Sequence, residues 1–349
     1  MAKALVIGKG KSGEAASSRL RSLGYEVEFA DGVDLVVTSP GVPVKSELQL
    51  GVEELKKRGV KLLAVTGSKG KSSVVKLVAD AIGGVPCGNF GLPVSAARET
   101  EWAVVEVSSF QLETTTLSSD AFEAAALLNL QSDHLSRHGS LEVYHSLKRK
   151  LLTFTRRPIV AEANADARLF TGTYFDNDVL RPNGCAAVAL MRVAGLDDAA
   201  ITRAFRYFRP LPHRMETVGV FGGVAYVDDS KATSIAALVA GVKMAKGRVR
   251  LIAGGLPKGD DPASALPVLT ERVEKVYIIG QSAEAFAAAW KGKVDCEICG
   301  TLDQAVATAK REAVEGETVI LSPGAASFDQ FENFEQRGEV FAKLVKKEG

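Results

Sequence analysis

The residues best placed to do chemistry lie in the stretch AVTGSKGKSS at 64–73. A short apolar run ends at Thr66, two glycines follow, and apolar residues then recur at helical spacing up to Ile82. Glycines let the backbone turn its N–H groups inward, and the N-terminus of a helix adds a partial positive charge. The pattern predicts a phosphate-binding loop in which Lys71 reaches terminal phosphates and Ser72 coordinates Mg²⁺.

This loop is shorter than the common phosphate loop, because its spacing is G-x-x-G-K-S instead of G-x-x-x-x-G-K-[ST]. The short form indicates a particular branch of nucleotide-binding enzymes. The alternative is a tight glycine turn with a surface lysine, which would not require a strand before the turn and a helix after it. The residues of this loop expected to bind the nucleotide are Gly67, Ser68, Lys69, Gly70, Lys71, Ser72 and Ser73.

A second glycine loop, GKGKSG at 8–13, follows an expected buried strand at 4–7 and opens a helix. A strand at 25–31 ends in an acidic residue about 20 positions on, which matches the dinucleotide fingerprint. The segment at 34–43 is the only further expected strand before a helix at about 46–58. So small a unit suits a phosphate or diphosphate of another ligand better than a whole dinucleotide.

Polar residues follow two further apolar runs. Glu106 ends the run WAVV, and Asp133 and His134 follow an apolar strand that begins at about residue 125. Ligands of open parallel sheets bind at the carboxyl ends of the strands, so these groups and the phosphate loop are expected at one edge. His134 suits either a second metal ion or a hydrogen-bonding loop. The next helix carries Tyr144 and Lys148.

The remainder of the chain predicts an irregular segment, a helix and a third α/β unit. Residues 160–180 lack a clear pattern, and an alanine-rich helix is expected from Asn183 through Gly195. From about residue 209, expected strands alternate with helices, which indicates another doubly wound unit. These strands lie at about 222–229, where one ends in Asp228-Asp229, and at about 249–254, 275–280, 294–298 and 317–321. Its polar loops suggest a mobile domain that closes over substrates.

The sequence therefore predicts an α/β protein of three domains. They are a small Rossmann-like domain at 1–47, a central ATPase-type parallel-sheet domain at 48–210 and a Rossmann-like domain at 211–349. A net charge of +1 gives no reason to expect nucleic acid or a membrane as partner. Four cysteines are too few for a disulfide framework, and the single C-x-x-C at 296–299 lacks the second pair of a zinc site. We expect a cytoplasmic monomer.

Ordered motifs along nearly the whole chain resemble the Mur ligase family, in a shortened form. They are GKGKSG, SPG, AVTGSKGKSS, GNFG, EVSSFQLE, LLNLQSDH, YHSLK, LPHRME, DDSKATS, GGLPKG, LSPGAASFDQF and NFEQRG. The phosphate loop alone would suit any Mur ligase or folylpolyglutamate synthase, whereas EVSSFQLE, DSKAT and NFEQRG resemble the D-glutamate-adding branch. The resemblance implies an ATP- and Mg²⁺-dependent amide-bond ligase of peptidoglycan precursor synthesis. It would add D-glutamate to UDP-N-acetylmuramoyl-L-alanine through an acyl phosphate.

The resemblance also implies a role for individual residues. The implied catalytic residues are Lys71, Glu106, His134, Lys148 and Lys231. The implied metal ligands are Ser72, Glu106, His134 and Lys148, the last of which the family carbamylates. The implied nucleotide contacts outside the loop are Asn183, Arg214 and Asp229. The implied D-glutamate site comprises Lys231, Thr233, Lys258, Ser327 and Phe334. The implied UDP-substrate contacts are Gly10, Lys11, Ser12, Gly13, Asn89 and Ser108.

Two of these assignments have a plain structural alternative. Lys148 begins the run Lys148-Arg149-Lys150, which read alone indicates a solvated helix face. Phe334 read alone is a core residue, and its expected role is through its backbone or packing.

Several features depart from the family pattern. The chain is short between its second expected strand and residue 34 and again between about 157 and 182. Lys69 stands where asparagine is usual, and Gln131-Ser132 where a Thr-Glu pair is common. The first gap would trim the uridine site. The alternatives are a related ligase with another amino acid or a folate acceptor, a non-catalytic ATP-binding relative, and an NAD-type oxidoreductase suggested by GKGKSG.

Overall fold

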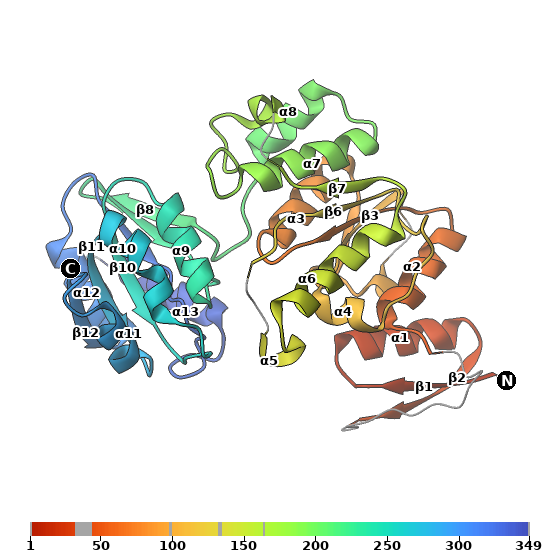
Figure 1. The fold of residues 1–349 in the computed structure, drawn as a ribbon, viewed down its shortest axis with the longest axis horizontal. Coiled ribbons are helices and arrows are strands. Elements are labelled where there is room, and N and C mark those ends of the chain that lie inside the picture. The colour runs from red at the N-terminus through yellow and green to blue at the C-terminus, as the bar shows by residue number, and fades with distance from the viewer. Residues whose placement is uncertain (1, 32–43, 98–99, 132–134, 163–164, 348–349) are drawn as a thin grey trace. The chain divides into compact units, whose positions relative to one another are not determined.

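The computed structural model describes residues 2–31, 44–97, 100–131, 135–162 and 165–347 (Figure 1). The strand expected at 34–43 and the pair Asp133-His134 lie outside these residues. The chain divides into two compact units, Met1–Phe208 and Arg209–Gly349. The described residues form three sheets with helices between the strands, so the predicted α/β class is confirmed. The three domain boundaries expected from the sequence stay a prediction.

The first unit holds two parallel sheets, one of strands β1-β2 and one in the order β4-β5-β3-β6-β7. Its strands are β1 Ala2–Ile7, β2 Tyr25–Ala30, β3 Lys61–Thr66, β4 Val85–Gly88, β5 Trp102–Glu106, β6 Ala124–Leu127 and β7 Pro158–Val160. Its α-helices are α1 Lys11–Ser22, α2 Glu47–Lys57, α3 Lys71–Ile82, α4 Ser109–Thr114, α5 Leu135–His138, α6 Leu141–Lys150, α7 Arg181–Val193 and α8 Asp198–Tyr207. Its 3₁₀ helices are η1 Val94–Ala96, η2 Leu151–Phe154 and η3 Ala165–Phe170.

The prediction that residues 4–7 form a buried strand is wrong in part. Val6 is 8% exposed, but Leu5 and Ile7 are 60% and 44% exposed. Side chains alternate between the faces of a strand. A Cβ on Gly13 of α1 would lie 3.6 Å from Val6 Cγ1, so Val6 faces α1. Leu5 and Ile7 point to the other face, which no described helix covers.

The small sheet is joined to the central one through α1 and α2. Arg19 Nη2 of α1 donates to Glu54 Oε2 of α2 over 2.7 Å, and both side chains are largely buried. Ser46 is the N-cap of helix α2, because its hydroxyl accepts a hydrogen bond from Gln49 N–H. Gly51 of α2 lies against η1, because a Cβ there would come within 2.6 Å of Ser95 N.

The central sheet is apolar on both faces around β3. Leu62, Leu63, Ala64 and Val65 are each no more than 1% exposed, as expected of a parallel strand covered on both sides. Helices α2 and α4 pack with Leu62 and Ala64 in one core, and α3 and α7 lie on the opposite face (Figure 1). The expected phosphate-loop helix is confirmed as α3, which ends at a left-handed Gly83.

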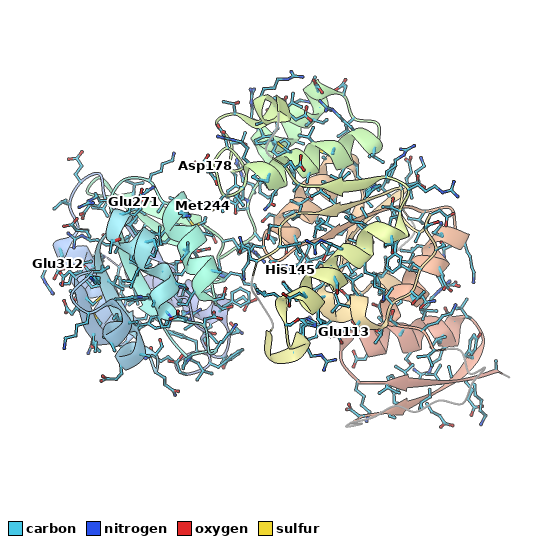
Figure 2. The ribbon with its side chains drawn as sticks, in the orientation of Figure 1. Glu113, His145, Asp178, Met244, Glu271 and Glu312 are labelled. Carbon is cyan, nitrogen blue, oxygen red and sulfur yellow. The ribbon has the colours of Figure 1, made fainter. Side chains whose placement is uncertain are left out.

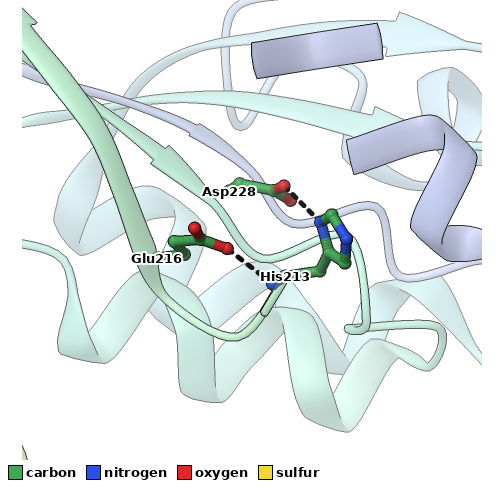
Figure 3. Close-up of side chains that lie close together, drawn as sticks. All are labelled: His213, Glu216 and Asp228. Carbon is green, nitrogen blue, oxygen red and sulfur yellow. Dashed lines mark hydrogen bonds and ion pairs between the residues drawn. The ribbon is translucent and has the colours of Figure 1, made fainter. Parts of the chain in front are cut away.

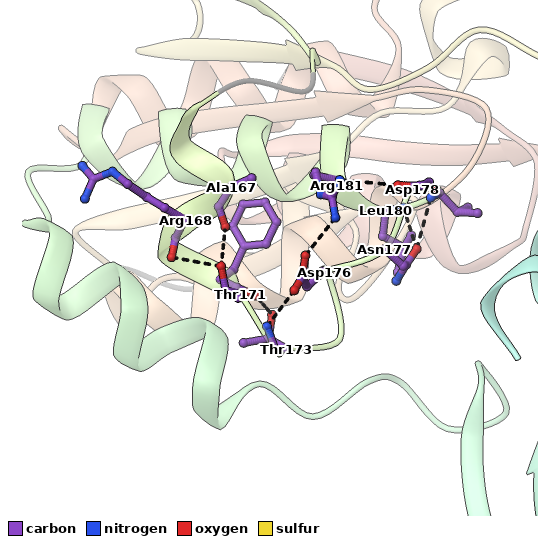
Figure 4. A network of polar contacts seen from close by, with 12 residues as sticks. Ala167, Arg168, Thr171, Thr173, Asp176, Asn177, Asp178, Leu180 and Arg181 are labelled. Atoms are coloured by element: carbon purple, nitrogen blue, oxygen red, sulfur yellow. Dashed lines mark hydrogen bonds and ion pairs between the residues drawn. The ribbon is translucent and has the colours of Figure 1, made fainter. Parts of the chain in front are cut away.

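The segment at 157–182 has more structure than the sequence predicts. It contains β7 and η3, and a polar network closes the loop that follows (Figure 4). Asp176 accepts from Gly172 N–H over 2.8 Å and from Arg181 Nη2 over 3.1 Å. Helix α7 begins at Arg181, two residues before the predicted start. These side-chain hydrogen bonds stabilise a loop whose sequence shows no regular spacing of apolar residues.

The second unit is one sheet in the order β12-β11-β10-β13-β9-β8, parallel except that β8 pairs antiparallel with β9. Its strands are β8 Glu216–Phe221, β9 Val224–Asp228, β10 Val249–Gly254, β11 Val273–Ile279, β12 Cys296–Gly300 and β13 Thr318–Leu321. Its helices are α9 Ile235–Met244, η4 Pro262–Ala265, α10 Leu266–Arg272, α11 Ala283–Trp290, α12 Leu302–Glu312 and α13 Phe334–Lys346. The expected strands are confirmed, with ends shifted by one or two residues.

The helices of this unit form two layers. Helices α9, α10 and α11 pack with one face of the sheet, and α12 and α13 with the other. A polar cluster crosses the second face. Tyr277 OH donates to Glu312 Oε2 over 2.8 Å, and Arg250 Nε donates to Glu317 Oε2 over 2.6 Å; Figure 2 shows Glu312 on α12.

We expect Gly51→Ala to lower the thermal unfolding midpoint. Alanine in an exposed helix interior is favoured over glycine by about 1 kcal/mol, but this Cβ would overlap the backbone at Val94 and Ser95. Overpacking of this kind costs about 1–3 kcal/mol. Circular dichroism melting measures the change, with the exposed Lys57→Ala on the same helix as control. A higher midpoint for Gly51→Ala would contradict the packing of α2 on η1.

Candidate functional site

The phosphate loop requires its two glycines. Gly67 has φ 153°, and a Cβ there would lie 2.9 Å from Leu128 Cβ. Gly70 has φ 82°, in the left-handed region, and a Cβ there would lie 2.2 Å from Asn183 Nδ2. Lys71 is the first residue of α3, and its Nζ donates to Gly67 O over 2.9 Å and to Ser68 O over 3.2 Å. The predicted strand, loop and helix are therefore confirmed.

Residues that follow β6 fix the loop from one side. Ser68 Oγ accepts from Gln131 N over 2.9 Å, and Lys69 N–H donates to Asn129 Oδ1 over 2.9 Å. Asn129 Nδ2 in turn donates to Lys69 O over 2.8 Å. Sequence reasoning did not single out Asn129, although its place directly after a buried strand is the signal that could have found it.

Helix α6 brings Lys148 to the same loop. Lys148 is 2% exposed, its Nζ donates to Gly67 O over 2.9 Å and lies 4.7 Å from the centre of the Tyr144 ring. Tyr144 OH donates to Ser68 Oγ over 3.1 Å. The solvated-face reading of this run is therefore wrong for Lys148, while Arg149 is exposed.

Two ammonium groups thus bind one carbonyl oxygen. Lys71 Nζ and Lys148 Nζ each lie 2.9 Å from Gly67 O, so they are at most about 5.8 Å apart. Like charges at such a distance repel. The arrangement suits the binding of a polyanion, or a change that makes one of the two lysines negative.

Glu106 has the features of a metal ligand. It is 1% exposed at the end of β5, and its Oε1 accepts from Asn89 Nδ2 over 2.8 Å. Among the described residues nothing hydrogen-bonds its buried Oε2. A buried carboxylate oxygen without a donor is costly unless a cation binds it. The register pairs Glu106 with Val65, two residues before the phosphate loop. Glu106 therefore fits Mg²⁺. Ser72 is 8% exposed in the first turn of α3, and His134 lies outside the described residues.

The other expected residues of the first unit have clear local positions. Asn183 is buried behind Gly70, and its Oδ1 accepts from Asn129 Nδ2 over 3.3 Å. Ser108 forms a capping box with Gln111 at the start of α4. A Cβ on Gly13 would lie 1.9 Å from Gly8 O, which is why the GKGKSG turn needs glycine. Gly10, Lys11 and Ser12 form the start of α1.

A buried cluster that the sequence did not indicate joins α4 to α5. His138 Nε2 lies 3.0 Å from Ser109 Oγ, and His138 Nδ1 lies 3.1 Å from Glu113 Oε1. Figure 2 shows Glu113 on α4. The contacts hold the helix after Glu106 against the helix that follows the 132–134 segment.

In the second unit, Asp229 is a buried carboxyl group. Ser322 Oγ donates to its Oδ2 over 2.9 Å, and Met215 N–H donates to its Oδ1 over 3.2 Å. Burial raises the pKa of Asp229 to about 7, although these two bonds and the charge of Arg214 oppose the shift. Arg214 and Asp229, both predicted nucleotide contacts, are therefore coupled electrostatically.

His213, Glu216 and Asp228 offer three metal-ligating atoms within 4.8 Å of one another (Figure 3). Hydrogen bonds account for this arrangement. His213 Nδ1 lies 2.7 Å from Asp228 Oδ2, and His213 N–H donates to Glu216 Oε2 over 2.9 Å. The bonds hold the left-handed turn at His213, which has φ 60° and directly precedes Arg214.

The residues expected to bind D-glutamate comprise two contacting pairs and a buried serine. Lys231 Nζ lies 3.5 Å from the centre of the Phe334 ring, and Lys258 Nζ donates to Thr233 Oγ1 over 3.0 Å. Ser327 is buried in the loop after β13, which pairs with the loop after β10 at Leu256 and Ala326.

The two cysteines of the C-x-x-C motif lie on β12. Cys296 and Cys299 are free on β12, and burial raises the pKa of each thiol to about 11. In the part of the chain that the structure describes, no helix is long and apolar enough to cross a membrane.

Comparisons with known proteins agree with this layout. Residues 65–175 match the Mur ligase middle domain, and residues 213–325 match the Mur ligase, glutamate ligase domain. The chain is 34% identical to a UDP-N-acetylmuramoylalanine--D-glutamate ligase from Acidobacterium capsulatum, over 98% of this chain and 96% of that protein. It is 32% identical to a protein of the same name from Chlamydia caviae, over 91% and 85%.

The first alignment also shows that this chain is shortened. It runs over 445 positions, whereas the chain has 349 residues, so at least 96 aligned positions have no residue here. Among solved structures, MurF ligase from Thermotoga maritima in complex with ADP has a TM-score of 0.65 at 16% identity, covering 99% of this chain and 95% of that one. That likeness concerns the fold.

We expect the stability of the unliganded protein to depend on Asp229 between about pH 4 and pH 7. Its pKa is raised from 3.8 to about 7 on folding, so in this window the folded state keeps a proton that the unfolded chain has lost. Stability should therefore fall as pH rises, by up to about 1.4 kcal/mol per pH unit.

The measurement is urea unfolding across this window, with Asp229→Asn and with the exposed Asp303→Asn as control. Asp229→Asn should lose this component of the slope, and the control should keep it. Parallel pH profiles for Asp229→Asn and the wild type would contradict the raised pKa.

Proposed function

This chain belongs to the Mur ligase family, and we propose that within it the protein adds D-glutamate to UDP-N-acetylmuramoyl-L-alanine at the expense of ATP. The observation that carries the proposal is the likeness to D-glutamate ligases at 34% identity over 98% of the chain. The buried phosphate loop with Lys71 and Lys148, and the cationic loops of the second unit, support it. The product would be a precursor of peptidoglycan.

The phosphate loop would bind the nucleotide. Its backbone N–H groups and the N-terminus of α3 face the phosphates, as at other helix N-termini that bind anions. The ammonium of Lys71 would leave Gly67 O for a terminal phosphate oxygen. Arg214 and Asp229 would be further nucleotide contacts, and Asn183 would contact the nucleotide from behind Gly70.

Ser72 and Glu106 would hold Mg²⁺, together with His134 and Lys148. The ion supplies charge neutralisation at the phosphate oxygens. Glu106 Oε2 suits this role because it is buried and no described residue donates a hydrogen bond to it. Asn89, which donates to the other carboxylate oxygen, would orient Glu106.

Carbamylation of Lys148 would replace one of the two positive charges at Gly67 O by a negative charge. The reaction joins the neutral amine to CO₂, loses a proton and leaves an anion. That anion would lie close to Lys71 Nζ, so two like charges would become an ion pair. The cation–π contact with Tyr144 would be lost.

The reaction class follows from the groups available. The carboxylate of the UDP-linked alanine attacks the γ-phosphorus of ATP, ADP leaves, and an acyl phosphate forms. The amine of D-glutamate then attacks the acyl carbon, and phosphate leaves with one carboxylate oxygen. Lys71 and Lys231 would stabilise negative charge as it develops. Lys231 and Lys258, with Thr233, Ser327 and Phe334, would hold the dicarboxylate acceptor.

The test is phosphate release from ATP and Mg²⁺ with UDP-N-acetylmuramoyl-L-alanine and either D- or L-glutamate. We expect release that requires D-glutamate and the UDP substrate together, because attack by the amine frees the phosphate. Omission of each substrate in turn is the control. Such release would also mean that the shortened N-terminal part still binds the UDP substrate.

Other outcomes would contradict the proposal in different ways. Release with another amino acid or a folate would indicate a related ligase. ATP binding without acceptor-dependent release would indicate a non-catalytic relative.

A further inference from the structure

Arg337 is a buried cation next to the loops that carry residues expected to bind D-glutamate. It belongs to the NFEQRG motif on α13 and is 1% exposed. Within the described part of the chain, its guanidinium donates hydrogen bonds only to neutral groups. Nε donates to Ser230 Oγ over 3.0 Å, Nη2 to Ser230 O over 2.9 Å and to Ala325 O over 3.2 Å, and Nη1 to Ala325 O over 3.3 Å and to Ala326 O over 3.2 Å.

Among the residues that the structure describes, no carboxylate forms an ion pair with Arg337. Burial lowers its pKa to about 10, with Asp329 and Asp228 acting against that shift from a distance. A buried charge is tolerated only where its donors are satisfied, and here the acceptors are mostly backbone carbonyls of two loops.

Two of the three residues that accept these hydrogen bonds directly precede a residue expected to bind the amino-acid substrate. Ser230 is followed by Lys231 in the loop after β9, and Ala326 is followed by Ser327 in the loop after β13. Ser230 Oγ also donates to Phe334 O over 2.8 Å, at the first residue of α13. One side chain therefore ties together the three segments that carry Lys231, Ser327 and Phe334.

The surroundings leave this side chain little freedom. A Cβ on Gly255 would lie 3.2 Å from Arg337 Nη1, and a Cβ on Gly338 would lie 2.2 Å from His213 Nδ1. The α13 backbone therefore lies directly against the His213–Asp228 pair at the end of β9. Arg337 and its hydrogen-bond partners can therefore fix these loops without any contact with a ligand.

We propose that Arg337 is a positioning residue for the amino-acid acceptor. It holds the loops after β9 and β13 and the start of α13 in the arrangement that binds the acceptor carboxylates, and it adds a buried positive charge beneath them. The inference rests on the proposed function for the identity of the acceptor, but not for the tie between the loops. Lysine cannot replace arginine here, because a single ammonium cannot reach acceptors on both loops in the plane of a guanidinium fork.

The first measurement does not depend on activity. Hydrogen–deuterium exchange is compared between the wild type, Arg337→Lys and Ser230→Ala, which removes one acceptor with little change of volume. The control is Arg311→Lys, at an exposed arginine of α12. We expect amides in residues 229–234 and 323–328 to exchange at least tenfold faster in both test variants, with β10 and β11 unchanged. Unchanged exchange in both loops would overturn the proposal, whatever the substrate.

The second measurement is steady-state kinetics with each substrate varied in turn. We expect Arg337→Lys to raise the KM for D-glutamate at least tenfold and the KM for ATP less than twofold, with a smaller shift of the same kind in Ser230→Ala. A merely structural role would raise both constants together or lower only the amount of folded enzyme, and either result would overturn the proposal.

If the wild type uses another amino acid, the proposed function fails and the KM of that amino acid replaces that of D-glutamate. If the wild type has no turnover, the exchange result alone decides.

Discussion

The parallel pairing of β3 with β5 and β6 is the constraint on which the first unit's site depends. Its register places Val65 beside Glu106 and Thr66 beside Leu127. The phosphate loop, the Glu106 carboxylate and the segment of Asn129 therefore leave the sheet at the same edge. Side chains alternate along a strand, so a slip of one residue would turn Glu106 to the opposite face. The apolar run at Leu62–Val65, buried on both sides, fixes this register.

In both units, cationic side chains donate hydrogen bonds to backbone carbonyl oxygens near the ends of parallel strands. In the first unit, Lys71 and Lys148 share Gly67 O. In the second, Arg337 binds the hydroxyl of Ser230 and the carbonyls of two loops. These bonds hold the cations near the ends of the strands, where anionic ligands of parallel sheets bind. This is the electrostatic pattern expected for a triphosphate and a dicarboxylate amino acid.

The features that could be predicted from the sequence depend on residues close together in the chain. The phosphate loop was predictable because glycine spacing, a preceding apolar run and helical periodicity act within a few residues. The burial of Lys148 was not, because it depends on how α6 docks against a loop 81 positions away in the sequence. Leu5 and Ile7 belong to an apolar run, yet one face of β1 has no described helix over it. No sequence pattern around Arg337 indicates that its side chain is buried. The role that we propose for it rests on its five hydrogen bonds in the structure.

The central claim is that this chain joins a carboxylate to an amine through an acyl phosphate. The most direct measurement uses UDP-N-acetylmuramoyl-L-alanine with oxygen-18 in its alanine carboxylate, followed by mass analysis of the released phosphate. The account predicts that D-glutamate-dependent phosphate carries one labelled oxygen, because the carboxylate oxygen leaves with the phosphoryl group. Unlabelled phosphate would mean that water attacks ATP, and it would contradict the account.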